Sequence, residues 1–376
     1  MARKSRSPKK KSNPPEPGPE PAAAPTTPEP QPQTDPQIPA ADPGASAPDL
    51  HESAKPADPN LGLRRLAARD LVAGRYRLVR LLGKGRLSAV WLAHDESADR
   101  ECALKFLSAS FSEGPLLDVL EAGVARAREL DHPNIVRVFE LVKDPAHALL
   151  AVAMEVVGTG ESLAARREAQ PAGSFEPDAI AEWVGQCCEA LAVAHERGSV
   201  HRNLQPANLL LDAVGAVKIA DFGIPAPLDV PPLHFTRRDT AGTATYQSPG
   251  QLRGEAPQPA DDLYSLGVTL HELLCGKPPF VAASADFQLY QVTNQPMPGA
   301  SAHRREITGV DAPVPQTWEE TIAALLSLDA TGRPGVAEVA MRLAGSPAAR
   351  SRCLRLIVVD AQGSNEPLEL ALETVP

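Results

Sequence analysis

Residues 199–223 read SVHRNLQPANLLLDAVGAVKIADFG, and this stretch decides how the rest of the chain is interpreted. Two short apolar runs, Leu209–Leu211 and Val217–Ala220, are separated by a polar, glycine-containing turn, which is the pattern of a β-hairpin. Asn208 immediately precedes the first run and Asp221 follows the second. An amide oxygen and a carboxylate that converge in this way suit a hard, oxygen-seeking cation such as Mg²⁺.

The same stretch resembles the catalytic loop and metal loop of the eukaryotic-type protein kinases, and its style is that of the bacterial Ser/Thr members. Their usual text is H-R-D-L-K-x-x-N followed by D-F-G. Here the text is HRNLQPAN, with Asn203 at the position of the aspartate and Gln205 at the position of the lysine. The resemblance implies that Asn203 and Gln205 occupy catalytic positions and that Asn208 and Asp221 are the metal ligands.

The resemblance also implies an α+β, bilobal fold. We expect a small amino-terminal lobe, made of an antiparallel β-sheet with one helix, and a larger, mainly helical carboxy-terminal lobe. Hydrophobic patterning predicts the main elements of both lobes. The predicted strands are 76–82, 89–94, 101–107, 135–141 and 149–155, and the predicted helices are 115–130, 177–197, 261–275, 285–292, 318–326 and 336–343.

Further kinase-like motifs predict a nucleotide site in the amino-terminal lobe. A glycine-bearing turn resembles the flap that covers the phosphates, although Ser88 replaces its third glycine. Lys105, in ECALKFL, matches the catalytic lysine that pairs with the α- and β-phosphates, and a lysine on a central strand needs such an anionic partner. By resemblance, the nucleotide-binding residues are Gly83, Gly85, Val90, Ala103, Lys105, Met154, Glu155, Val157 and Leu210.

One acidic residue of the family pattern is missing from the predicted helix 115–130. In kinases a helix glutamate pairs with the strand lysine, and counting along the chain puts that position at Gly123 or Val124. Glu121 lies about one turn before Val124. It either substitutes for the missing glutamate through a one-turn shift of the helix or is an ordinary surface residue.

Another departure lies in the carboxy-terminal lobe. The text GTATYQSPG resembles the end of a kinase activation segment, but Gly250 replaces a glutamate that pairs with a buried arginine in the family. The corresponding arginine is Arg333, so we expect it to be solvated or paired with another acid, because an unpaired buried guanidinium is costly. Asp262 matches the aspartate that braces the catalytic loop, and Thr243 suits a Ser/Thr-type substrate loop.

The chain of 376 residues has a formal net charge of −10, which is spread along the sequence and gives no indication of a nucleic-acid partner. Of its 39 prolines, 16 lie in the first 60 residues, where large apolar side chains are scarce. We therefore expect a disordered Pro/Ala-rich tail with a basic start at 1–60. The kinase-like domain is predicted at 70–345, with lobes at 70–155 and 156–345, followed by a short extension at 346–376.

The cysteines point to a reducing, cytoplasmic location. The five cysteines include no CxxC pair. His271 and Cys275 stand one helical turn apart, but two candidate ligands do not make a metal site. No apolar run reaches the ~18 residues that span a bilayer, so no transmembrane segment is predicted, and the expected partners are proteins.

Together these features favour a catalytically impaired kinase-like domain, a pseudokinase, which binds ATP and Mg²⁺ and acts as a scaffold or nucleotide sensor. Asn203 cannot accept a proton, and a general base contributes ~10²–10⁴-fold. We expect transfer roughly three to five decades below the ~1–100 per second of a kinase. Two alternatives stay open: an active Ser/Thr protein kinase that transfers the ATP γ-phosphate to protein, and a nucleotide-free protein-interaction module.

Overall fold

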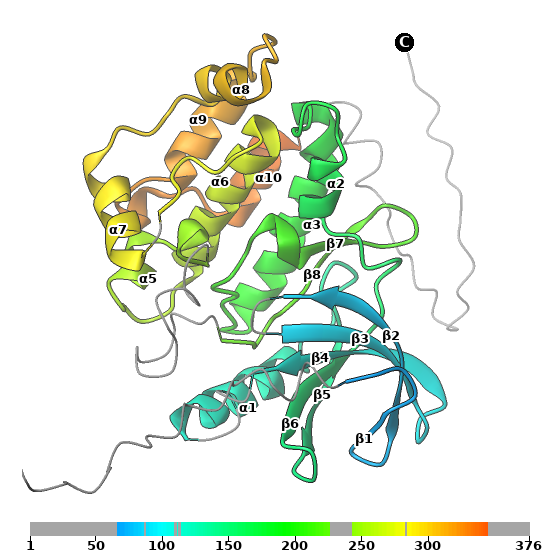
Figure 1. Cartoon of the computed structure of the whole chain (residues 1–376). Helices are drawn as coiled ribbons and strands as arrows, with labels where there is room; N and C mark the ends of the chain where they lie inside the picture. The colour runs from blue at the N-terminus through cyan, green and yellow to red at the C-terminus, as the bar shows by residue number, and fades with distance from the viewer. Residues whose placement is uncertain are drawn as a thin grey trace, which may run out of the picture. The chain divides into compact units, whose positions relative to one another are not determined.

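The computed structural model describes residues 66–85, 88–108, 111, 114–225, 243–282 and 284–344. The predicted tail at 1–60, the extension at 346–376 and most of the activation segment lie outside these residues. The described part contains a β-sheet region followed by a helical region (Figure 1). This is the bilobal α+β arrangement that the sequence predicts.

The amino-terminal lobe is a six-stranded antiparallel sheet with strand order β1-β2-β3-β4-β6-β5. Its strands are β1 (Leu71–Val72), β2 (Tyr76–Lys84), β3 (Ser88–Asp95), β4 (Arg100–Leu107), β5 (Val138–Asp144) and β6 (Leu149–Met154). Helix α1 (Pro115–Ala127) contacts β5 and buries an apolar stripe that includes Leu116, Leu120 and Val124. The strands β3, β4 and β6 are rich in Ala and Leu, and most of their residues are buried.

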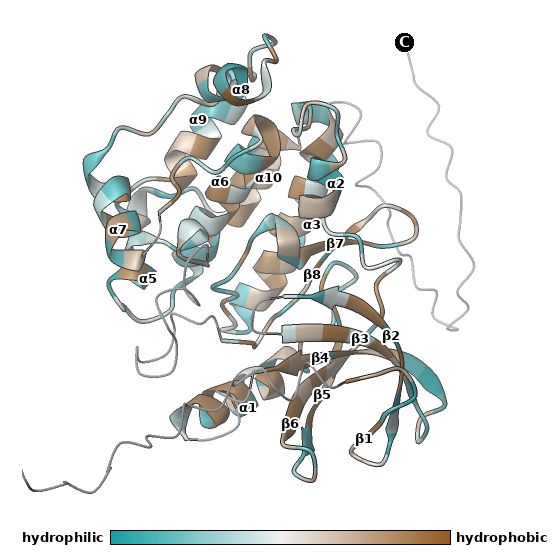
Figure 2. Ribbon diagram, in the orientation of Figure 1, coloured by the Kyte–Doolittle hydropathy of each residue, from teal (hydrophilic) through white to brown (hydrophobic). Residues whose placement is uncertain are grey.

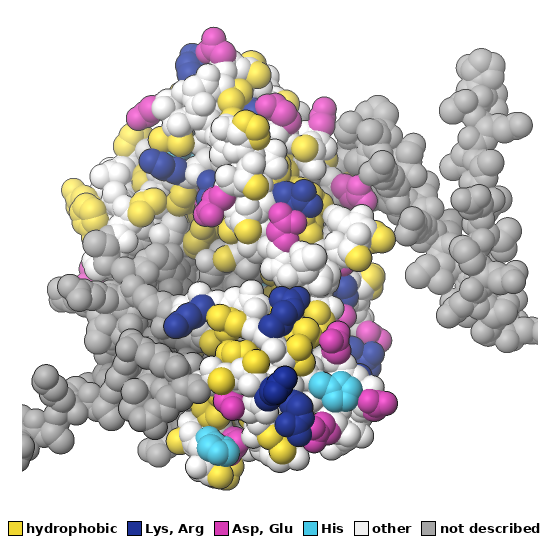
Figure 3. Space-filling view, turned by 45° about the vertical axis from the view of Figure 1, so that its right-hand side comes forward, with side chains coloured by type: hydrophobic (Ala, Val, Ile, Leu, Met, Phe, Trp, Pro, Cys, Tyr) yellow, Lys and Arg dark blue, Asp and Glu magenta, His cyan; other side chains and the backbone are white. Residues whose placement is uncertain are grey.

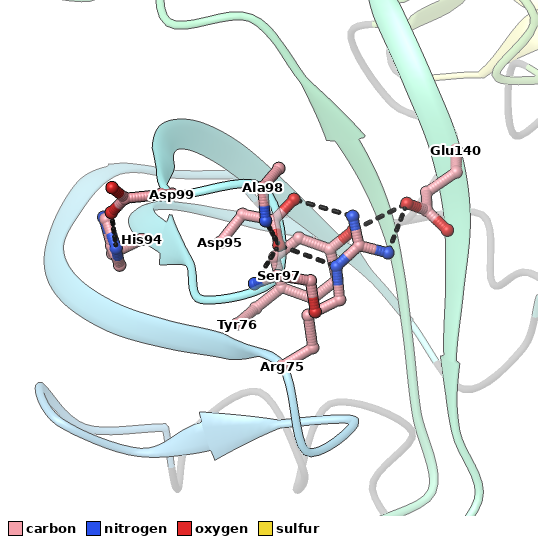
Figure 4. Close-up of polar contacts among 8 residues, drawn as sticks. All are labelled: Arg75, Tyr76, His94, Asp95, Ser97, Ala98, Asp99 and Glu140. Atoms are coloured by element: carbon pink, nitrogen blue, oxygen red, sulfur yellow. Dashed lines mark hydrogen bonds and ion pairs between the residues drawn. The ribbon is translucent and has the colours of Figure 1, made fainter.

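A polar network connects the start of β2 with the end of β3 and with β5, as Figure 4 shows. The Arg75 guanidinium donates two 2.7 Å hydrogen bonds to the buried carboxylate of Asp95 and one of 2.9 Å to Glu140. Tyr76 Oη donates to the same Glu140 carboxylate at 2.8 Å. The bidentate pair with Arg75 lowers the pKa of Asp95 to about 2, and the N–H groups of Ser97 and Ala98 add to this effect.

The carboxy-terminal lobe is helical apart from one hairpin, β7 (Leu209–Leu211) with β8 (Val217–Ile219). Helix α6 (Pro259–Cys275) is buried on every side from Asp261 to its end, and the ribbon coloured by hydropathy shows its position among the other helices (Figure 2). A helix that is buried all round is the centre of its lobe. The remaining helices are α2 (Leu163–Glu168), α3 (Pro177–Glu196), α5 (Pro249–Leu252), α7 (Ala285–Asn294), α8 (Ala300–Thr308), α9 (Gln316–Leu325) and α10 (Val336–Leu343).

The elements differ from the predicted ones in several places, and two of these differences have a clear physical reason. The strand expected at 135–141 begins only at Val138, because Ile135 instead forms an isolated parallel bridge with Ile219 of β8. Helix α8 was not predicted, since its sequence ASAHRREIT is largely polar and buries only Ala300 and Arg304. A short polar helix of this kind gives little periodic signal.

The described surface carries mixed charge. On the face shown in Figure 3, Lys and Arg side chains lie interspersed with Asp and Glu side chains, and no single sign dominates. Within the described residues, no helix combines the length and the apolar character required to cross a membrane.

Candidate active site

The predicted hairpin is present, and backbone hydrogen bonds connect the two segments that flank its strands. The Ala220 N–H donates to the Asn208 carbonyl at 2.8 Å, and the Asn208 N–H donates to the Gln205 carbonyl at 2.9 Å. Asn208 and Asp221 are both buried. The structure therefore brings the two predicted metal ligands to one end of the hairpin, as the sequence indicated.

A buried carboxylate on α6 holds the catalytic loop. Asp262 accepts hydrogen bonds from the backbone N–H groups of His201 at 2.9 Å and Arg202 at 2.7 Å. Its third donor is His195 Nε2 on α3, at 2.7 Å. His201 Nε2 donates to the Ala220 carbonyl at 2.7 Å, which connects the loop to the strand that leads to Asp221. The bracing role expected for Asp262 thus has a geometric basis.

Two residues of the site adopt left-handed backbone conformations that non-glycine residues rarely adopt. Arg202 has φ 64° and Asp221 has φ 71°. Each costs on the order of 1–3 kcal/mol and persists only where surrounding contacts impose it. Around Arg202 the contacts are the Asp262 carboxylate on the N–H and Gln251 Nε2, which donates to the Arg202 carbonyl at 2.9 Å.

The two substituted positions of the catalytic loop bind each other. Gln205 Nε2 donates to Asn203 Oδ1 at 2.9 Å, so a neutral amide pair lies where the family pattern has an aspartate and a lysine. Asn208 Nδ2 donates to the Asn203 carbonyl at 2.9 Å, which orients the Asn208 amide. No ionisable side chain takes part in this set of contacts.

Lys105 and Asp221 form a direct ion pair across the site, with both side chains mostly buried. Lys105 lies on β4 opposite Val90 of β3 and Val152 of β6. The strand thus places the ammonium group above the loop that carries Asp221. The sequence did not predict this pairing, because the anionic partner expected for Lys105 was phosphate or a helix glutamate.

The predicted adenine-site residues lie at the junction of sheet and helices. Ala103 pairs in register with Met154, and one apolar cluster contains both together with Val157, with partly buried Val90 and Leu210 packed against it. After Met154, two backbone groups are available to hydrogen-bond the edge of a ligand. No described residue hydrogen-bonds the Glu155 carbonyl or the Val157 N–H, whereas the Glu155 N–H donates to Arg137.

The flap is described only at its two ends, because residues 86 and 87 lie outside the described part of the chain. The Gly85 N–H donates to the Ser88 carbonyl at 2.8 Å and closes the turn. A Cβ placed on Gly83 would meet no atom within 4 Å, so the backbone there is open to approach. Gly83 therefore lies near the end of β2, where it pairs with Val90, and Gly85 lies in the turn that follows.

Glu121 is a surface residue in this structure and does not replace the missing helix glutamate. Glu121 forms an ion pair with Lys143 of β5, and both side chains are about half exposed. Gly123 instead faces the Asp221–Gly223 segment, where a Cβ on Gly123 would lie 2.1 Å from the Gly223 carbonyl oxygen. Glu121 therefore does not pair with Lys105 in this structure.

The buried guanidinium of Arg333 has found partners other than an acid. Its Nη1 donates to the Ala260 carbonyl at 2.7 Å and its Nε donates to the Ser327 carbonyl at 3.0 Å. The group also lies over the Tyr264 ring, 5.1 Å from the centroid. Neither expected outcome, solvation or a substitute acid, is observed among the described residues; two carbonyls and an aromatic face take the place of a carboxylate.

Gln251 is a site residue that the sequence reasoning missed. Ser248 caps α5 by accepting from the Gln251 N–H at 3.1 Å, and the Gln251 side chain returns a bond to the Ser248 N–H. The same side chain holds the Arg202 carbonyl. The spacing Ser-x-x-Gln is a capping-box signature. The start of α5 could therefore be predicted from the sequence, whereas the contact with Arg202 could not.

The structure combines a sheet lobe and a helical lobe with a loop that Asp262 braces and a hairpin flanked by Asn208 and Asp221. This is the arrangement of a protein kinase fold. The sequence signature of the protein kinase domain matches residues 76–342, and the chain belongs to this family. Members of the family generally use ATP and Mg²⁺.

The curated relatives include Ser/Thr protein kinases of actinobacteria. The chain is 36% identical over 249 residues to PknA of Corynebacterium glutamicum, covering 64% of this chain and 52% of that protein. It is 34% identical over 248 residues to PknB of Mycobacterium tuberculosis, covering 65% of this chain and 39% of that protein. The chain thus spans about half or less of the length of these relatives. The crystal structure of the M. tuberculosis PknI kinase domain aligns with TM-score 0.59 and 23% identity over 74% of this chain and 99% of that one, which supports the fold.

Proposed function

We propose that this chain is a kinase-fold domain that binds ATP with Mg²⁺ and transfers the γ-phosphate far more slowly than an intact protein kinase does. The observation that carries the proposal is the 2.9 Å hydrogen bond from Gln205 to Asn203 Oδ1. The two neutral amides of this pair stand where an intact kinase has an aspartate and a lysine. The chain would then act mainly through protein partners whose binding depends on the nucleotide state.

The proposal that ATP binds rests on charge and on unused backbone groups. Lys105 supplies a cation for the phosphates, and Asn208 and Asp221 offer an amide oxygen and a carboxylate, which are ligands that Mg²⁺ accepts. The free Glu155 carbonyl and Val157 N–H match the donor and acceptor edge of adenine. Nucleotide and Mg²⁺ together would replace the direct ion pair between Lys105 and Asp221 with phosphate and metal contacts.

The proposal that transfer is slow rests on the loss of charge. An amide oxygen can orient a hydroxyl group but cannot accept its proton, and Asn203 Oδ1 already accepts from Gln205. A neutral Gln205 also supplies no positive charge near the transferring phosphate, where electrostatic stabilisation contributes most. Lys105 lacks a helix glutamate that would hold it in place once Asp221 turns to the metal.

An active Ser/Thr protein kinase is the second candidate function. Its support is the 34–36% identity to proteins named Ser/Thr protein kinases, together with the intact bracing of the catalytic loop by Asp262. Phosphoryl transfer depends largely on positioning, through a loose transition state, so a braced loop retains part of the rate.

A thermal-shift titration of the full chain with ATP, with and without Mg²⁺, tests nucleotide binding. At 100 times its dissociation constant, the nucleotide adds ~2.7 kcal/mol to the free energy of unfolding and raises Tm. The Lys105→Met variant is expected to lose the shift. Lys143→Met is the matched control, because this exposed lysine lies on β5 and pairs with Glu121. A flat titration of the native chain would contradict the proposal and favour a nucleotide-free interaction module.

A further inference from the structure

We infer that the structure contains a second metal site, separate from the active site, built by His271 and Cys275 of α6 and His303 of α8. The sequence offered only the first two, one helical turn apart, and gave no third ligand. Folding brings α8 against α6, as Figure 1 shows. The two ring nitrogens and the sulfur then lie within 4.8 Å of one another.

The separation of the histidine nitrogens fits a tetrahedral ion. His271 Nε2 and His303 Nδ1 are 3.4 Å apart. Two nitrogens that each bind a tetrahedral zinc ion at ~2.0–2.1 Å are about 3.3–3.4 Å apart. Two imidazoles and one thiolate are a ligand set that Zn²⁺ accepts readily. The nitrogen and sulfur ligands therefore point to zinc rather than to Mg²⁺ or Ca²⁺, which prefer oxygen.

A hydrogen bond on the outer side of His271 orients its ring for this role. His271 Nδ1 donates to the Lys277 carbonyl at 3.1 Å, which leaves the Nε2 lone pair directed at the other two groups. Metal-binding histidines usually donate their second ring nitrogen in this way, to a carbonyl or a carboxylate. The contact fixes the tautomer that a metal requires.

The burial of the cluster also suits metal binding. His271 and Cys275 are fully buried, and His303 is partly exposed. Neutral imidazoles are ready ligands, and the incoming ion displaces the thiol proton to the solvent.

The fourth position of the ion would be filled from the solvent side, where His303 is partly exposed. The cations near the cluster are balanced by anions. Lys277 and Glu306 lie near His303, and Arg304 and Glu319 lie near Cys275. With a thiolate as one ligand, the bound ion adds a single positive charge to this balanced surrounding. The bound ion would cross-link the carboxy-terminal end of α6 to α8.

The site is independent of the proposed nucleotide pocket in its chemistry. Asn208 and Asp221 also suit a divalent cation, but their ligand atoms are oxygens. A thiolate gives Co²⁺ a sulfur-to-metal charge-transfer absorption in the near ultraviolet, and an oxygen site does not. This difference allows the two sites to be read separately in one protein.

The test is a Co²⁺ and Zn²⁺ titration of the full chain, stripped of metal and kept reduced with a phosphine. We expect one equivalent of Co²⁺ to produce the thiolate band, one equivalent of Zn²⁺ to bleach it, and Zn²⁺ to raise Tm. The Cys275→Ser variant should lose the band, and His303→Gln should weaken Co²⁺ binding at least tenfold. His303 is partly exposed, so its variant is expected to fold even if Cys275→Ser does not.

Two control variants carry the same kinds of change elsewhere. His94→Gln removes a partly exposed histidine whose side chain pairs with Asp99, as Figure 4 shows, and Cys102→Ser removes a buried cysteine on β4. Both are expected to retain the band and the one-to-one stoichiometry. The inference is overturned if the native chain gives no thiolate band at micromolar Co²⁺. It is also overturned if the band survives in Cys275→Ser or if His303→Gln binds Co²⁺ as tightly as the native chain.

Discussion

Gly123 of α1 and Gly223, the last residue of the Asp-Phe-Gly segment, pack backbone against backbone. A Cβ on Gly123 would lie 2.1 Å from the Gly223 carbonyl oxygen, and a Cβ on Gly223 would lie 2.2 Å from the Gly123 carbonyl oxygen. Gly223 also has φ 77°, which favours glycine. The helix therefore approaches the metal loop through the space where a side chain would stand, and a glutamate at Gly123 has no room in this arrangement.

The close approach predicts that Gly123 tolerates no side chain. Gly123→Ala forces the helix away from Gly223 and should lower the free energy of unfolding by about 1–3 kcal/mol, the range of overpacked sites. Gly332→Ala is the control, because its Cβ would make only an ordinary 3.7 Å contact with Ser327 Oγ. Urea unfolding measures both variants. Equal stability of Gly123→Ala and the native chain would show that the two backbones are not in contact in solution.

Glu121 is predicted to be irrelevant to nucleotide binding. Its partner is Lys143, and the pair is about half exposed, so Glu121→Gln should change stability by less than about 1 kcal/mol. The dissociation constant for ATP with Mg²⁺ should stay within twofold of the native value in a fluorescence or calorimetric titration. A tenfold loss of affinity would mean that α1 shifts by one turn when the nucleotide binds.

The Arg75–Asp95 pair gives a pH-dependent prediction. The folded-state pKa of Asp95, about 2, lies below its ordinary value of 3.8. An aspartate with a lowered pKa stabilises the fold above its unfolded pKa and loses that contribution as the pH falls through the folded pKa. Because Arg75 is partly exposed, the contribution at pH 7 is about 1–2 kcal/mol.

Asp95→Asn should therefore cost stability at pH 7, and the cost should be unchanged down to about pH 5. It should shrink below pH 4 as the carboxylate of the unfolded chain becomes protonated. Chemical unfolding of both proteins at pH 7, 5, 4 and 3 measures the difference. A difference that grows on acidification would contradict the assigned direction of the pKa shift.

Arg333 is predicted to be structurally required even though no acid pairs with it. Arg333→Lys loses the geometry of two donors aimed at the Ala260 and Ser327 carbonyls and the stacking over Tyr264. It should lower the free energy of unfolding by about 1–3 kcal/mol. Arg342→Lys is the matched control, since Arg342 forms an exposed pair with Glu338 on α10. Similar small effects of both changes would show that the buried contacts of Arg333 contribute little.

Most of the fold was predictable because its signals are local and periodic. The hairpin of 209–219, the long helices α3 and α6, and the strand that carries Lys105 all follow from apolar spacing, and the kinase motifs fix their order. The sequence does not reveal α8, whose residues are mostly polar, nor the shortened start of β5, which depends on a bridge to a distant strand.

The site was predictable in its residues but not in its pairings. The motifs identify Lys105, Asn203 and Asp221, whereas the ion pair of Lys105 with Asp221 and the bond of Gln205 to Asn203 depend on tertiary geometry. The same limit applies to the His271 cluster. Its third member, His303, is 28 positions beyond Cys275 and becomes a neighbour only when α8 folds onto α6.

The central claim is that the neutral pair of Asn203 and Gln205 limits phosphoryl transfer. Its most direct test is a single-turnover assay of the full chain with γ-labelled ATP, Mg²⁺ and dephosphorylated casein, with Asp221→Asn as the background. The Asn203→Asp, Gln205→Lys double variant is predicted to transfer phosphate ~10²-fold faster than the native chain, or more. Native transfer at the ~1–100 per second of ordinary kinases, with no gain in the double variant, would contradict the claim and identify the chain as an active Ser/Thr protein kinase.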